Sequence, residues 1–233
     1  MKAIRLLGAT LLASTTLLGA GSAFADTINP EPATAQTPFS AVLSLNEQPS
    51  APVAPNQPGQ GGADHTTDIK GLFGIAYAPE LLSGSATLKE SGSQDVPLRN
   101  SKASSNTFNV GVQDKTRKND QNWVLKASVS WNDNANANGY MNGVTVKTFE
   151  GNVKENKNGE LIELTDSQVN ASAAELNIGE VETNVMSAQN GKTMNGVYNY
   201  QFRNPQLSIP DVSRVAAGTY SGNITWNLAN TPN

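Results

Sequence analysis

Few side chains of this sequence could act as catalysts or as metal ligands. The 233 residues include one histidine, His65, and no cysteine. Because we expect His65 to lie outside the folded part, Ser-His-Asp and Cys-His catalysis are not available to that part, nor are zinc sites built from His and Cys. His65 lies in a Gly/Asp-rich stretch, where we expect it to be solvated. The 20 acidic residues could supply the carboxylate pair of a glycosidase, but no spacing singles out a pair. We therefore interpret the chain as a non-enzyme that needs neither a cofactor nor a metal ion.

Two short segments are similar to ligand-binding loops but lack essential positions. Gly191-Lys192-Thr193 ends like a phosphate-binding loop, yet Met186 stands where that loop needs a glycine. Residues 132–139 are similar to a calcium loop, but Thr145 stands where a bidentate glutamate belongs. We interpret this second segment as a polar turn. The formal net charge of −4 also argues against nucleic acid as a partner, because binding phosphates needs clustered basic charge.

Trp-x-Leu occurs twice, each time within a two-residue alternation of apolar and polar side chains. The first copy holds Trp123 and Leu125, and the second holds Trp226 and Leu228. Successive side chains of a β-strand point to opposite faces, so each copy lines the apolar face of a half-buried strand. The two apolar faces have the same composition, and we predict that the two strands are neighbours in space.

The sequence leaves open whether these four motif residues form the core or a contact surface. In the core, each tryptophan would remove roughly 150–250 Å² from water. Replacing either one would then destabilise the domain without affecting any ligand. On the surface, the two motifs would present an aromatic shelf to a glycan, because an exposed apolar patch on a secreted domain commonly marks an interface.

The remaining pattern predicts an all-β fold. Asn-Gly occurs five times, and both residues tolerate the positive φ of tight hairpin turns. Residues 167–176 contain three alanines and leave a short helix open. We predict a single β-sandwich-like or barrel-like domain with a long Pro/Gly-rich loop near the N-terminus. The strand-like runs are residues 69–82, 108–113, 123–131, 144–149, 197–202, 206–209 and 219–228.

The ends of the sequence predict an exported protein. Residues 1–25 have the form of a secretory signal peptide, with Lys2 and Arg5, then an apolar stretch, and a small-x-small cleavage site at Ala25. That stretch is too short to span a bilayer comfortably, so we expect no transmembrane segment in the mature chain. We expect a flexible segment over residues 26–38 and the β-domain over residues 39–233, beginning with a strand at residues 39–45. Within it, residues 46–66 are expected to be a disordered Pro/Gly-rich loop.

The two motifs and their surroundings resemble the WxL-domain surface proteins of low-GC Gram-positive bacteria. The matching parts occur in the family's order, although the family's usual Phe-Gly ending of the apolar segment is replaced by Leu82-Ser83-Gly84. They are the run at residues 39–45, Ala78-Pro79, residues 112–117 leading to Trp123, and residues 207–210 and 218–220 leading to Trp226.

The resemblance implies a secreted protein that is attached non-covalently to the cell wall or cell surface. Its partner would be peptidoglycan or another wall glycopolymer, and it would serve adhesion or a surface complex with other surface proteins. The alternative is a structural subunit that docks onto another anchored surface protein, with no direct glycan binding. Exposed strand edges would suit that second role.

Overall fold

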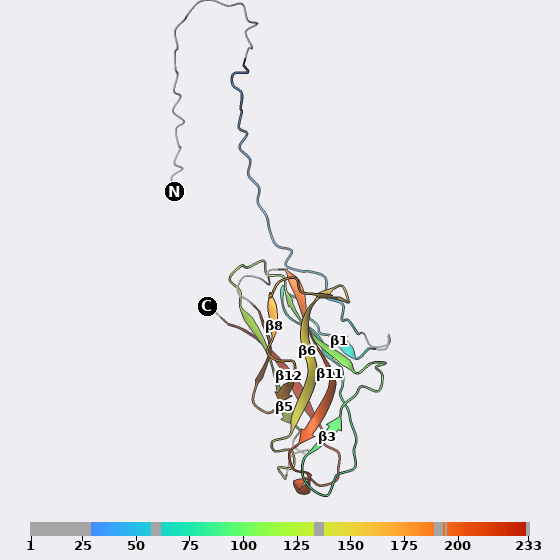
Figure 1. Cartoon of the computed structure of the whole chain (residues 1–233). Helices are drawn as coiled ribbons and strands as arrows, with labels where there is room; N and C mark the ends of the chain where they lie inside the picture. The colour runs from blue at the N-terminus through green and yellow to red at the C-terminus, as the bar shows by residue number, and fades with distance from the viewer. Residues whose placement is uncertain (1–28, 57–61, 133–137, 189–192, 194, 232–233) are drawn as a thin grey trace, which may run out of the picture. The chain divides into compact units, whose positions relative to one another are not determined.

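The computed structural model describes residues 29–56, 62–132, 138–188, 193 and 195–231 (Figure 1). The chain divides into two units, residues 1–43 and residues 44–233, and each is described by itself. In the first unit, residues 29–43 are exposed and contain no strand. The predicted signal peptide lies outside the described residues.

The second unit consists of two antiparallel sheets that are not closed into a barrel, which confirms the β-sandwich. The larger sheet has the order β1-β2-β4-β11-β6-β7, with β3 also paired to β11 and β9 to β6. The smaller sheet has the order β12-β5-β10-β8. The elements are β1 (Asp64–Thr66), β2 (Phe73–Pro79), β3 (Gln94–Pro97), β4 (Thr107–Asp114), β5 (Trp123–Trp131), β6 (Thr145–Lys157), β7 (Glu160–Glu163), β8 (Val169–Ala171), β9 (Leu176–Ile178), β10 (Thr183–Ala188), β11 (Gly196–Ile209), the 3-10 helix η1 (Val212–Arg214) and β12 (Gly222–Asn230).

The core lies between the facing sides of the two sheets. From the larger sheet, Phe202 of β11 stacks on Phe108 of β4 with ring centroids 5.6 Å apart, and on Tyr200 at 5.9 Å. From the smaller sheet, Leu125 and Ala127 of β5 belong to the same buried cluster. The two-residue alternation of these strands therefore places their apolar side chains in one shared core.

The other side of the larger sheet holds a buried polar network. Tyr77 Oη donates to Asn199 Oδ1 (2.9 Å), and Asn199 Nδ2 donates to Asn109 Oδ1 (2.9 Å). Asn109 donates from its backbone N and its Nδ2 to the carboxylate of Asp64, at 3.0 and 2.7 Å. Burial raises the pKa of Asp64 to about 6, although the hydrogen bonds from Asn109 oppose the rise. These polar groups tolerate burial because they satisfy one another.

The Pro-rich segment before β1 is ordered where we expected disorder. We call residues 50–56 the strap. Its carbonyl groups accept hydrogen bonds: Val53 O from Asn156 Nδ2 (2.8 Å), and Asn56 O from the backbone N of Asp64 (2.8 Å). Ala54 of the strap is buried. Proline lacks an N–H but keeps its carbonyl, so a Pro-rich segment packs when its neighbours supply the donors. The expected disorder over residues 46–66 is therefore wrong for the strap and for β1, while residues 57–61 lie outside the described part.

The strand predicted at residues 39–45 does not form. Phe39, Val42 and Leu43 are 96, 97 and 93% exposed, and no residue of this segment is assigned to a strand. Two-residue alternation alone is not enough, because a strand needs a neighbour to satisfy its backbone groups. This segment therefore has the composition of a strand without having a partner strand.

The helix left open at residues 167–176 is also absent. The segment instead contains β8 and the first residue of β9, and it buries Val169 and Leu176 in the main core. Helix propensity is a weak preference that packing overrides. The prediction that Asn-Gly pairs form tight turns with positive φ is confirmed at the hairpin between β6 and β7. There Asn158 and Gly159 have φ values of +57° and +96°.

Candidate functional site

The two motif strands pair directly with each other. β5 and β12 run antiparallel through a continuous register from Trp123 opposite Asn230 to Trp131 opposite Gly222. Leu125 lies opposite Leu228, and Trp226 lies opposite Ala127. Both strands belong to the smaller sheet, and Figure 1 shows them next to each other. The prediction that the two motifs are neighbours in space is confirmed.

The first copy of the motif is part of the core. Trp123 is only 1% exposed, Leu125 is fully buried, and the Trp123 ring lies 6.1 Å from that of Tyr198. The indole Nε1 of Trp123 donates to Thr193 Oγ1 (3.3 Å), and the Thr193 hydroxyl donates to Asp114 Oδ2 (2.7 Å). β5 lies between β12 and β10, so this copy is covered on both sides. Neither Trp123 nor Leu125 is open to a ligand.

The second copy of the motif is only half-buried. Trp226 packs across the sandwich on Phe202, with ring centroids 6.2 Å apart. Trp226 and Leu228 nevertheless keep partial exposure, because β12 is an edge strand of its sheet. Of the four motif residues, only these two can touch another molecule.

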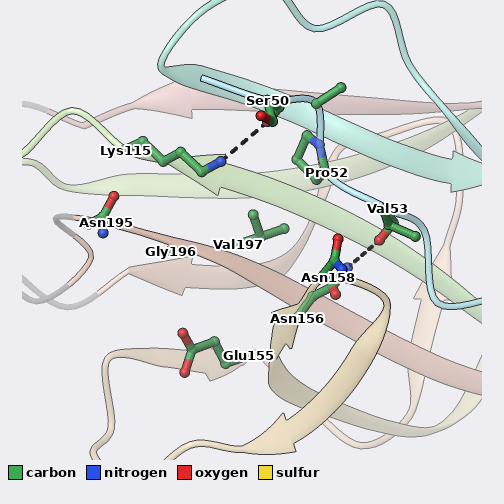
Figure 2. A pocket seen from close by; sticks show the side chains of 11 residues that line it. Ser50, Pro52, Val53, Lys115, Glu155, Asn156, Asn158, Asn195, Gly196 and Val197 are labelled. Atoms are coloured by element: carbon green, nitrogen blue, oxygen red, sulfur yellow. Dashed lines mark hydrogen bonds between the residues drawn. The ribbon is translucent and has the colours of Figure 1, made fainter. Parts of the chain in front are cut away.

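A shallow hollow of about 250 Å³ is the other candidate site (Figure 2). The strap forms one wall, and the opposite parts come from β6, the β6–β7 turn and the start of β11. Lys115 follows β4 and donates from Nζ to Ser50 O of the strap (3.4 Å). Figure 2 shows Lys115 and Glu155 on different sides of the hollow. Its remaining polar lining is made of Ser50 and the amide side chains of Asn156, Asn158 and Asn195. The Asn156 amide is already hydrogen-bonded to Val53 O and to the backbone N of Gly159.

The hollow combines one ammonium group, one carboxylate and several amides. Partial burial lowers the pKa of Lys115. Glu155 is also within 3.4 Å of Lys157 Nζ. Such a lining can hydrogen-bond a polar ligand that carries few charges, such as an amide-bearing sugar or a short peptide. Sequence reasoning missed this site because its walls come from separate segments and one of them was expected to be disordered.

Other site types are not found in the described part of the chain. Among those residues, no group of three or more His, Asp or Glu side chains is placed to hold a metal ion. Within the same residues, no helix is long and apolar enough to cross a membrane.

Comparison with known proteins gives one finding at the level of the family. Searches of curated proteins and of solved structures found no match. The family model described as "WxL domain surface cell wall-binding" matches residues 30–232. This span includes the strap, both sheets and both Trp-x-Leu strands. The chain therefore belongs to the WxL family of cell-wall-binding surface domains.

Proposed function

We propose that this protein is exported, binds the Gram-positive cell wall non-covalently through peptidoglycan, and serves as a component of an adhesion or surface complex. The observation that carries the proposal is the family match, which spans the whole β-domain and concerns wall binding. The predicted signal peptide supports export.

The hollow is our proposed contact with the wall. Peptidoglycan is rich in N-acetyl and peptide amides, and the amide side chains of Asn158 and Asn195 can hydrogen-bond such groups. Lys115 would add a charge-assisted hydrogen bond to a carboxylate of the peptide stem. The buried Trp123 and Leu125 of the first motif copy take no part in this contact.

Co-sedimentation with purified peptidoglycan tests the proposal. Residues 26–233 should pellet with walls that have been stripped of protein, and binding should saturate. Lys115→Glu should weaken it about tenfold, as expected for a lost charge-assisted hydrogen bond. Lys118→Glu, at a nearby exposed position, is the matched control and should bind like the unsubstituted chain. Folded protein that stays in the supernatant at all salt concentrations would count against wall binding.

The second candidate function is docking onto another anchored surface protein. The edge of β12 favours it, since a nine-residue strand with one neighbour in its sheet suits docking by strand addition. The stripped walls separate the two functions. If the chain binds native walls but not stripped ones, its attachment is indirect.

A further inference from the structure

We propose that this protein self-associates head to tail, with residues 39–45 of one copy added as a strand to the free edge of β12 in a second copy. Residues 39–45 are called the donor segment below. This inference does not depend on the wall-binding proposal. It rests on two features of the same chain. One is the edge of β12, which has no strand beside it in the described part of the chain, and the other is the exposed apolar donor segment.

The first feature is the exposed edge of β12. Edge strands are usually protected by shortness, charge, proline or bulges. The other outermost strands follow this rule, since β1 and β8 have three residues each, and β7 has four with a glutamate at both ends. β12 has nine residues, no charged side chain and no proline, and its pairing with β5 shows no bulge. In the described part of the chain, no other strand pairs with it.

The second feature is the incomplete cover over the inner face of β12. Ile224, Trp226 and Leu228 alternate along this face and pack on the core, yet all three are only partly buried. The same positions on β5 are buried, because β5 has neighbours on both sides. One more strand beside β12 would give Trp226 the cover that Trp123 already has.

The donor segment has the composition that such a strand requires. Phe39, Ala41, Leu43 and Leu45 alternate with Ser40, Val42 and Ser44, so one face is continuously apolar. Phe39, Val42 and Leu43 are almost fully exposed, which is costly in water. The donor segment has seven uncharged residues, and the edge of β12 has nine. Pairing the two would satisfy the free backbone N–H and C=O groups of both strands.

Head-to-tail geometry follows from this arrangement. Each chain carries one donor segment and one acceptor edge, and the two are different surfaces. A contact between different surfaces is heterologous, and it produces a ring or an open chain of copies. The occupant we assign to the β12 edge is therefore the donor segment of a second copy of this protein.

Analytical ultracentrifugation of residues 26–233 over a concentration series tests the proposal. Unsubstituted protein should form concentration-dependent species larger than one chain. Leu43→Asp in the donor segment and Ile224→Lys on the acceptor edge should each weaken association at least about tenfold. Val181→Asp is the matched control, because Val181 is an apolar residue that is 82% exposed and lies outside both features. It should associate normally.

Mixing the two variants is the decisive step. Leu43→Asp keeps an intact edge and Ile224→Lys keeps an intact donor segment, so together they should form a two-chain complex and nothing larger. A synthetic peptide of residues 37–46 should dissociate the unsubstituted assemblies, a readout that does not depend on how Ile224→Lys folds. Single chains at every concentration, or normal association of Leu43→Asp, would overturn the proposal. Leu43→Asp should still bind peptidoglycan, so failure of this proposal can be distinguished from failure of wall binding.

Discussion

The two Trp-x-Leu copies share a sequence pattern and lie on directly paired strands, yet they differ in burial. The copy on β5 is covered on both sides and belongs fully to the core. The copy on β12 has one neighbour and remains half-exposed. The same side chains therefore have different roles according to their position in the sheet. A motif of this kind identifies the fold, while the strand order decides which copy can meet another molecule.

The largest expected difference comes from Trp123→Ala. This substitution should lower the free energy of unfolding by about 3–5 kcal/mol, the usual range for a large aromatic removed from a core. Urea denaturation followed by circular dichroism measures the effect. A loss below about 1 kcal/mol would contradict the assignment of the first copy to the core.

Trp226→Ala should have roughly half that effect, about 2 kcal/mol, because its ring loses less apolar contact on substitution. The measurement belongs at a dilution where the protein is a single chain, so that self-association does not contribute. Equal losses for Trp123→Ala and Trp226→Ala would remove the distinction between the two copies.

Thr193→Val sharpens the comparison further, because within the described residues only the first copy has a hydrogen-bonded indole nitrogen. The substitution keeps the shape of the side chain but leaves Trp123 Nε1 without its acceptor and removes the hydrogen bond to Asp114 Oδ2. We expect a loss of about 1.5 kcal/mol in the free energy of unfolding. In the Trp123→Phe background, which has no indole N–H, the same substitution should cost less, because only the hydrogen bond to Asp114 is then lost.

The smallest predicted effect is a pH dependence of the free energy of unfolding. It concerns the domain as a whole and does not distinguish the two Trp-x-Leu copies. The folded pKa of Asp64 is about 6, above its ordinary value of 3.8. The stability that protonated Asp64 contributes to the folded state is therefore fully present at pH values below 3.8, and it is lost as the pH rises through about 6. Between pH 7 and pH 5 the free energy of unfolding should rise by about 1.3 kcal/mol from this group. Asp64→Asn should remove that part of the rise, and the difference between the two tryptophan variants should be the same at both pH values.

Much of the sandwich could be predicted from alternation. Residues 123–131 were predicted as a strand with the same bounds as β5, and the runs at residues 197–202 and 206–209 prove to be parts of the single strand β11. Alternation reports which residues share a face, and this was enough to predict that the two motifs are neighbours in space. It does not report whether a strand finds a partner, so residues 39–45 were wrongly predicted to form one.

The candidate hollow and the polar network could not be predicted in this way. Asn109 and Asn199 lie on the polar faces of their strands, which alternation assigns to solvent, yet both are fully buried. Their cover comes from distant segments, including the strap, and composition alone suggested that the strap was disordered. Its order depends on donors such as Asn156, about a hundred residues further along the chain, and no local pattern contains that information.

The direct pairing of Leu125 with Leu228 has a consequence for symmetry. In an antiparallel pair, a local two-fold axis through these leucines relates Trp123 to Trp226, since each precedes its leucine by two residues. A slip of the register by two residues would replace this leucine pair: in one direction both leucines would lie opposite tryptophans, and in the other Leu228 would lie opposite Ala127 and Leu125 opposite Asn230. The native register is thus the one that places leucine against leucine at the centre of the pair, and a related chain that keeps only one copy would lack this pairing.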